Sequence, residues 1–149
     1  MMSPVWLIVA DSSKARFFSM ESRTGPVEEI KCMVHTKARL HERDMTSDLP
    51  GRDSGKNGEG THTYQNKISP KEQENINFAS EIAAELDRVR KENKIKQFVL
   101  VASPEFLGKL REQMNEQTRN MVSLELAKNL SHLDPADIRE HLPRHLPAL

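Results

Sequence analysis

The chain has 149 residues, a length that fits one domain able to bury roughly 70% of its unfolded surface. Lysine and arginine balance aspartate and glutamate at 22 each. No overall charge therefore favours nucleic acid or a membrane surface, and an anion-binding role must depend on local patches. Cys32 is the single cysteine, which excludes an intrachain disulfide and a cysteine-based zinc cluster. We expect its thiol to be buried on a strand.

The sequence contains no stretch typical of an export signal or a membrane span. Its start, Met1-Met2-Ser3, precedes an apolar run of only six residues, without the basic residues, the length and the cleavage site of a signal peptide. No window approaches the ~20 apolar residues of a membrane-spanning helix. The sequence therefore predicts a cytoplasmic protein.

Three strands open the predicted fold. Residues 4–10 form a nearly continuous apolar run, which is typical of a central strand. After a tight turn at residues 11–13, residues 15–20 double back, and residues 27–34 form the third strand. The residues that alternate on one face of this strand are Ile30, Cys32 and Val34. We expect the three strands to form an antiparallel meander.

A long polar segment follows the meander. From residue 35 to residue 69 apolar residues are scarce, and this segment holds four of the six glycines. Loops this long are uncommon in compact domains and are usually functional or disordered. We therefore expect a single α/β domain over residues 1–149, with a glycine-rich excursion at about 35–69 and a short helix and tail at 131–149.

Two serine–proline pairs mark helix starts. The run Ser69-Pro70-Lys71-Glu72 forms a capping box with proline at the first helical position. Ser103-Pro104-Glu105 begins a second helix in the same way, after a buried strand over residues 97–102. A strand over residues 121–126 and a last helix over about 134–142 complete the order βββ–loop–α–β–α–β–α.

This order is typical of ribonuclease H-like folds. By analogy the five strands form a mixed sheet in the order 3-2-1-4-5, with the first strand central, helices on the faces and right-handed crossovers. A flavodoxin-like sheet is the alternative. It requires a helix between the first two strands, where this chain has only a few residues.

Ribonuclease H-like folds can support two-metal nuclease chemistry, in which several carboxylates converge on ions about 4 Å apart. Asp11 ends the first strand, and the first helix offers Glu81 or Glu85. The fourth strand, however, ends in Ala102-Ser103, where another acid is needed. We therefore predict no catalytic residue, no metal site and no cofactor. Asp11 is interpreted as a turn residue whose side chain bonds the backbone of residues 13–14.

An anion-binding surface fits the sequence better. Basic residues follow the first turn and recur along the excursion, and the start of the second helix adds backbone N–H donors. The candidate binding residues are Asp11, Ser12, Ser13, Lys14, Arg16, Arg39, Arg43, Arg52, Lys56 and Ser103. Acidic residues dilute the excursion, so RNA binding is expected to be modest and salt-sensitive. A mixed-charge solvated loop is the alternative.

Four motifs in a fixed order carry a family resemblance. They are Val9-Ala10-Asp11-Ser12-Ser13-x-Ala15-Arg16-Phe17, Asp48-Leu49-Pro50-Gly51-Arg52, Phe78-Ala79 and Leu100-Val101-Ala102-x-Pro104-x-Phe106-Leu107-Gly108-x-Leu110-Arg111. From about Val5 to Leu142 the chain resembles the family named host attachment protein. Bacterial members carry that name because one was linked to attachment to host cells. The family is in turn similar to the middle domain of archaeal and eukaryotic peptide-chain release factors, which is ribonuclease H-like without the nuclease acids.

The resemblance implies an association with RNA or the ribosome. In the release factors a Gly-Gly-Gln loop reaches the peptidyl-transferase centre. The corresponding connection here holds Gly58-Glu59-Gly60 without a neighbouring glutamine, so peptidyl-tRNA hydrolysis is not implied. We predict a non-catalytic module that binds RNA or the translation machinery through residues 33–56 and 11–16. The alternatives are a protein-interaction factor in attachment to host cells and, third, a metal-dependent phosphodiesterase.

Overall fold

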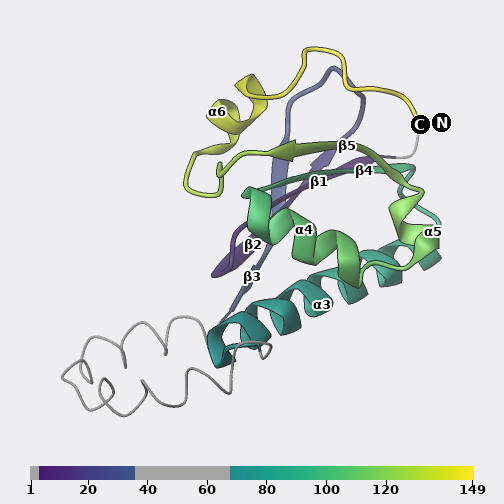
Figure 1. The fold of residues 1–149 in the computed structure, drawn as a ribbon. Helices are drawn as coiled ribbons and strands as arrows, with labels where there is room; N and C mark the ends of the chain where they lie inside the picture. Colours follow the sequence, from purple (N-terminus) through teal and green to yellow (C-terminus); the bar gives the residue numbers. More distant parts are fainter. Residues whose placement is uncertain (1–3, 36–67) are drawn as a thin grey trace, which may run out of the picture.

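The structure is a computed structural model that describes residues 4–35 and 68–149. Within these residues, five strands form one mixed sheet in the order β3-β2-β1-β4-β5 (Figure 1). The strands are β1 Val5–Ala10, β2 Lys14–Met20, β3 Glu28–Val34, β4 Gln97–Ala102 and β5 Val122–Ala127. The helices are α3 Pro70–Lys91, α4 Pro104–Gln113, α5 Glu116–Arg119 and α6 Pro135–Glu140. This is the ribonuclease H-like strand order that the sequence predicts.

Strand β1 lies at the centre of the sheet. It pairs antiparallel with β2 and parallel with β4, while β3 pairs antiparallel with β2 and β5 pairs parallel with β4. Because β1, β4 and β5 run in the same direction, their carboxyl ends meet at one edge of the sheet. The turn between β1 and β2 starts at that edge.

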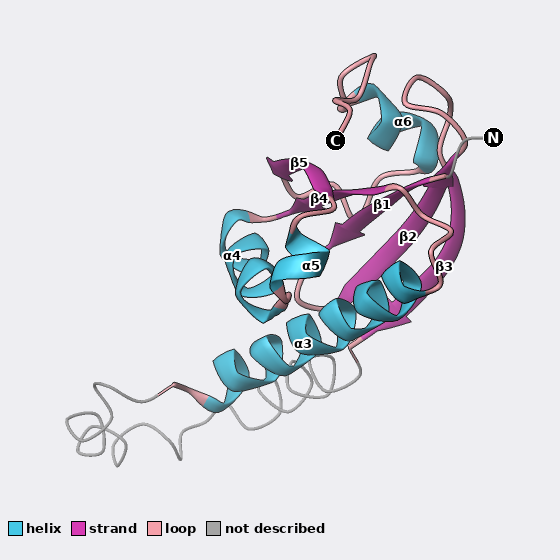
Figure 2. Cartoon of the chain, turned by 90° about the vertical axis from the view of Figure 1, so that its right-hand side faces the viewer, coloured by secondary structure: helices cyan, strands magenta, loops and turns pink. Residues whose placement is uncertain are grey.

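The two faces of the sheet are covered by different parts of the chain. Helices α3 and α4 lie on one face and α6 lies on the other (Figure 2). The first core includes Phe17, Phe78 and Phe98, all fully buried. The second core joins side chains of β1, β2 and β4 to apolar residues after β5. Those later residues are Leu130, Ile138, Leu142 and Leu146.

Side-chain caps begin the helices. The Ser69 hydroxyl accepts a 3.1 Å hydrogen bond from the Glu72 amide at the start of α3, and Asp134 caps α6 in the same way. Ser103 stands at the start of α4, but its hydroxyl makes no capping hydrogen bond. The helix therefore starts where the sequence predicts, but the Ser103 hydroxyl does not cap it. Helix α3 ends near Asn93, which adopts a left-handed φ of 60°.

The short helix α5 is not indicated by the sequence pattern. Asn115 caps it by accepting a 2.8 Å hydrogen bond from the Thr118 amide. Asp87 of α3 accepts hydrogen bonds from both residues, at 3.0 Å from Asn115 Nδ2 and 3.3 Å from Thr118 Oγ1. The bonds from Asn115 and then Arg90 hold the pKa of the Asp87 carboxyl well below its ordinary value. This carboxylate therefore fastens α5 to α3.

The prediction of a buried thiol at Cys32 is wrong. Cys32 is exposed, as are its neighbours on alternate positions, Ile30 at 46% and Val34 at 45%. Strand β3 is an edge strand, and its opposite face touches helix α3 through Lys31, which pairs with Glu85 at 2.7 Å. Most of that face is exposed as well. Alternation along one strand indicates a common face without indicating that another element covers it.

Replacing Cys32 with serine is expected to change the free energy of unfolding by less than about 0.5 kcal/mol, because surface substitutions rarely do more. Urea unfolding of the two proteins measures the difference. The native wild-type thiol is also expected to react promptly with a soluble thiol reagent. A loss well above 1 kcal/mol, or a thiol that reacts only after unfolding, contradicts its exposed position.

Candidate functional site

A pocket of about 190 Å³ opens at the carboxyl edge of the sheet, where β1 and β4 end side by side. It is lined by Asp11, Ser12, Asn75, Ser103, Glu105, Phe106, Lys109 and Asn129. After β1 the chain continues to β2 on one side of this strand pair, and after β4 it continues to β5 on the opposite side. Such a divergence of connections creates the crevice in which open α/β sheets bind ligands. We call this pocket the carboxyl-edge cleft.

Asp11 holds the turn that forms one wall of the cleft. Its Oδ1 accepts hydrogen bonds from the Ser13 amide at 2.7 Å, the Ser13 hydroxyl at 2.8 Å and the Lys14 amide at 2.9 Å. Its Oδ2 accepts one from the Ser131 hydroxyl. The interpretation of Asp11 as a turn residue is thus confirmed, and the bond from Ser131 adds a link that the sequence does not signal.

These bonds also set the charge of Asp11. Burial raises the pKa of its carboxyl, but the hydrogen bonds from Ser131, Ser13 and Lys14 outweigh the burial and hold the pKa below its ordinary value. Asp11 therefore stays ionised at neutral pH. With four donors already on its two oxygens, it shapes the cleft wall and has little capacity left for a ligand.

Arg16 is likewise committed to the fold. Its Nε and Nη2 donate to the Glu29 carboxylate at 3.0 and 2.8 Å, and its Nη1 donates to the carbonyls of Ser131 and Leu133. The guanidinium also lies 5.1 Å from the centroid of the Phe18 ring. Arg16 therefore fastens the segment after β5 to strand β2.

Most other polar side chains of the cleft have open hydrogen-bonding groups. Within residues 4–35 and 68–149, five of them make no side-chain hydrogen bond or ion pair, namely Ser12, Asn75, Ser103, Glu105 and Lys109. Asn129 contacts Ser131 through Oδ1 at 3.2 Å, which leaves its amide N–H groups open. Elsewhere charged side chains form ion pairs, such as that between Arg111 and Glu125 at 2.6 Å. Open polar groups that converge on a hollow can orient a ligand bound there.

His35 supports the cleft from behind. Its Nδ1 lies 2.7 Å from the Ser12 carbonyl oxygen, and its ring stacks on Phe78 with centroids 4.7 Å apart. Phe78 in turn contacts Phe106, which lines the cleft. This row of rings holds the β1–β2 turn against α3 and α4. The sequence places His35 in the excursion and gives no sign of this role.

The carboxylates that a two-metal nuclease needs are not gathered in the described part of the chain. No group of three or more histidine, cysteine, aspartate or glutamate side chains there could hold a metal ion. Two carboxylates, Asp11 and Glu105, line the cleft. Of the two helix acids considered from the sequence, Glu81 is exposed and Glu85 pairs with Lys31 and Arg88.

The structure brings some of the predicted site residues together and separates others. Asp11, Ser12 and Ser103 share the cleft, and Ser13 and Lys14 form the turn beside it. Outside the described residues lie Arg39, Arg43, Arg52 and Lys56. The cleft residues that the sequence reasoning missed are Asn75, Glu105, Phe106, Lys109 and Asn129. All of them except Asn75 follow β4 or β5, so the available signal was that parallel strands end at a common edge, whereas nothing in the sequence indicates Asn75.

The comparisons with known proteins place the chain in a family. It belongs to the family described as "Protein required for attachment to host cells", which matches residues 6–142. This confirms the family resemblance seen in the sequence motifs. None of the curated proteins matches the sequence. No described helix is long and apolar enough to cross a membrane.

Solved structures also resemble the chain. One is the crystal structure of the type II variant of the Aquifex aeolicus Ppx/GppA phosphatase, with a TM-score of 0.41 and 14% sequence identity. The match covers 85% of this chain and 35% of the phosphatase chain. The chain thus spans about a third of the length of that protein.

Proposed function

We propose that this protein is a non-catalytic binding module for RNA and that the carboxyl-edge cleft holds one unpaired nucleotide. The observation that carries the proposal is the set of uncommitted hydroxyl, amide and ammonium groups around one hollow. Its volume of about 190 Å³ is below the ~300–1,000 Å³ of pockets that enclose drug-sized ligands. A single base with its sugar is a ligand of suitable size.

The chemistry of the cleft supports this ligand class. Sequence-specific RNA recognition targets single-stranded bases, whose edges hydrogen-bond to side chains. The amide of Asn75 offers the paired donor and acceptor that match a base edge, and the amide of Asn129 adds open N–H donors. Lys109 offers a cation for the neighbouring phosphate. Arg39, Arg43, Arg52 and Lys56 are proposed to contact further phosphates along the strand.

The resemblance to release factors supports binding to RNA of the translation machinery, and therefore a location in the cytoplasm. An exposed free thiol at Cys32 suits a reducing compartment, where cysteines stay unpaired. Co-sedimentation of the tagged protein with ribosomes from its own cells tests this part of the proposal.

Replacing Asn75 with alanine is expected to weaken binding of a single-stranded RNA oligonucleotide about five- to tenfold, which is the usual loss for one hydrogen bond. Replacing Lys109 with alanine is expected to lower the slope of log affinity against log salt by about 0.7. Fluorescence anisotropy at several salt concentrations measures both effects. Lys94→Ala is the matched control, because Lys94 is exposed and lies outside the cleft.

The basic residues of the excursion are tested in the same assay. Alanine at Arg39, Arg43, Arg52 and Lys56 together is expected to lower the salt slope by about three, since each phosphate contact contributes about 0.7. The proposal fails if the wild-type protein binds no RNA at low salt and does not sediment with ribosomes. If the Asn75 and Lys109 variants bind RNA as tightly as the wild type does, the assignment of the nucleotide site to the cleft is wrong.

A second candidate function is a protein-interaction factor in attachment to host cells. The family description favours it, and so do Ile30 and Val34, two exposed apolar residues on the edge strand β3. Such exposed apolar side chains suit contact with another protein. Cell fractionation separates the two functions, because protein found outside the cytoplasm favours attachment over RNA binding.

A further inference from the structure

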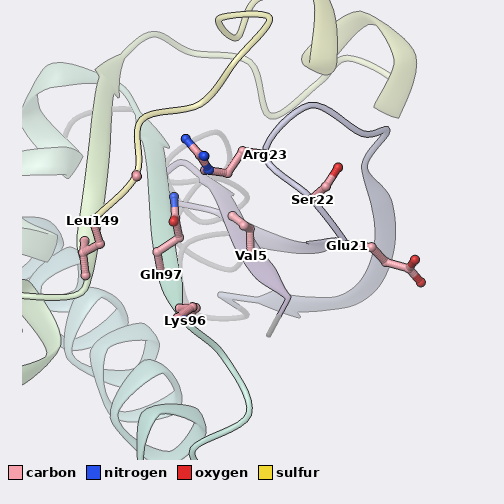
Figure 3. Close-up of a pocket in the computed structure, with 8 residues that line it drawn as sticks. Val5, Glu21, Ser22, Arg23, Lys96, Gln97 and Leu149 are labelled. Atoms are coloured by element: carbon pink, nitrogen blue, oxygen red, sulfur yellow. The ribbon is translucent and has the colours of Figure 1, made fainter. Parts of the chain in front are cut away.

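A second pocket lies at the opposite edge of the sheet, where β1 and β4 begin. Its volume is about 260 Å³, and it is lined by Val5, Glu21, Ser22, Arg23, Lys96, Gln97, Ala148 and Leu149 (Figure 3). The six-residue strands β1 and β4 separate it from the carboxyl-edge cleft by about 20 Å, at ~3.3 Å per residue. We call it the amino-edge pocket.

The floor of the amino-edge pocket holds an acceptor that no described residue pairs. Gln97 is 4% exposed, and its Nε2 donates to the Ser123 hydroxyl at 2.7 Å and the Pro147 carbonyl at 2.9 Å. A carbonyl oxygen can only accept, so the amide orientation is fixed. The Gln97 Oε1 accepts no hydrogen bond from any residue that the structure describes. This oxygen is therefore free to accept a hydrogen bond from a ligand N–H or O–H in the pocket.

Positive charge stands beside this acceptor. Arg23 donates from Nη1 to the Leu146 carbonyl at 3.0 Å, while its Nε and Nη2 bond no described residue. Lys96 is exposed and makes no ion pair within the described ranges. Figure 3 shows the Gln97 amide directed toward the side where Arg23 lies, whereas Glu21 is directed away from the pocket. The open guanidinium edge matches a carboxylate, which it can hold through two parallel hydrogen bonds.

The remaining wall is apolar. Val5 is 3% exposed at its base, and Leu149 adds an exposed aliphatic side chain. A ligand that satisfies all of these groups combines three features. It carries a carboxylate for Arg23, an N–H for Gln97 Oε1 and an aliphatic side chain for the apolar wall.

We propose that the amino-edge pocket binds the carboxylate and adjacent N–H of an apolar α-amino acid. A free amino acid and the C-terminal residue of a peptide both present this chemistry, and capture of a peptide's C-terminal carboxylate is a recurring mode of recognition. Lys96 adds a second cation at the rim. The site is independent of the RNA-binding proposal, because it shares no residue with the carboxyl-edge cleft.

The test titrates the full-length protein with three ligands while its amide NMR signals are followed. L-leucine and N-acetyl-L-leucine carry the carboxylate, and L-leucinamide lacks it. Saturable shifts are expected at the lining residues, with leucinamide at least about tenfold weaker than the better carboxylate ligand. Tighter binding of N-acetyl-L-leucine identifies a peptide C-terminus as the source, and tighter binding of leucine identifies a free amino acid.

Two variants assign the binding to this pocket. Arg23→Ala is expected to weaken binding about tenfold and Lys96→Ala about threefold. Arg144→Ala is the matched control, because Arg144 is exposed on the same C-terminal segment and lines neither pocket. If loss of the Leu146 contact unfolds the Arg23 variant, the Lys96 variant provides the test, since its side chain makes no described contact.

Three results overturn the proposal. One is the absence of shifts at the pocket with every ligand up to about 20 mM, a concentration that reveals even millimolar affinity. Another is equal binding of leucinamide, which shows that the carboxylate is not recognised. The third is wild-type affinity in both the Arg23 and the Lys96 variants.

Discussion

Replacing Ile138 with alanine is expected to lower the free energy of unfolding by about 2–5 kcal/mol, the usual cost of truncating a buried isoleucine. Ile138 is fully buried and is the α6 residue that packs into the second core. For a chain of this length the melting temperature should fall by about 2–4 °C for each kcal/mol. Urea unfolding and thermal unfolding followed by circular dichroism measure the two quantities.

The matched control is the same substitution at Ile30, which is 46% exposed on strand β3. Ile30→Ala should stay within about 0.5 kcal/mol of the wild type. Equal effects of the two substitutions would show that the segment after β5 does not cover the sheet. A change in the denaturant slope of the Ile138 variant alone would instead indicate altered compactness of the native or unfolded state.

Replacing Asp11 with alanine is expected to destabilise the protein by about 2–4 kcal/mol. The side chain accepts hydrogen bonds from Ser13, Lys14 and Ser131, and a partly buried donor that loses a charged acceptor costs about 1–3 kcal/mol. Three of the four donors, two backbone amides and one hydroxyl, belong to Ser13 and Lys14 at the turn itself. The loss should therefore be visible in urea unfolding at neutral pH, together with faster amide hydrogen exchange in the turn.

The contribution of Asp11 should depend on pH in a defined direction. The pKa of its carboxyl is lower in the folded state than in the unfolded state, so the unfolded state binds the proton more readily. The contribution is fully present above the unfolded pKa of about 3.9, and it is lost as the pH falls through the folded pKa. Stability measured below about pH 4 should therefore fall less steeply in Asp11→Asn than in the wild type.

Asp137→Asn is the control for this measurement. Asp137 is exposed near the start of α6, and its side chain makes no described hydrogen bond. Its pH profile should follow that of the wild type. A profile for Asp11→Asn that also follows the wild type would contradict the bonded turn. Lowered carboxyl pKa values at Glu29, Glu85 and Asp87 affect all these proteins equally and cancel in the comparison.

The fold could be predicted from the sequence because its signals are local. The apolar run of β1, the serine–proline helix starts at Ser69 and Ser103, and the short connection between β1 and β2 each limit the possible topology. Together they predict the order of the elements, and the analogy with ribonuclease H-like folds then supplies the strand order that the structure shows. Helix α5 escaped prediction because it is four residues long and depends on capping by Asn115 and on contact with Asp87.

The cleft could be predicted only in part. Asp11 and Ser12 were predicted because they begin the turn after the first strand, and Ser103 was predicted because it begins the second helix. Asn75 lies in the first turns of α3 and Asn129 lies after β5, and neither belongs to a sequence motif. They reach the cleft because distant segments meet there, which a linear pattern does not record. Arg16 illustrates the converse, since a basic residue that suggested ligand binding is paired with Glu29.

The link between Asp11 and Ser131 joins residues 120 positions apart, and Arg23 bonds a carbonyl 123 positions away. During synthesis, the sheet surface that Ile138 and its neighbours cover stays exposed until the segment after β5 has emerged. Until then an apolar surface on β1, β2 and β4 stays exposed to water and to other nascent chains. Emergence of the segment after β5, more than any early hairpin, is therefore the step that covers this surface and protects it against aggregation.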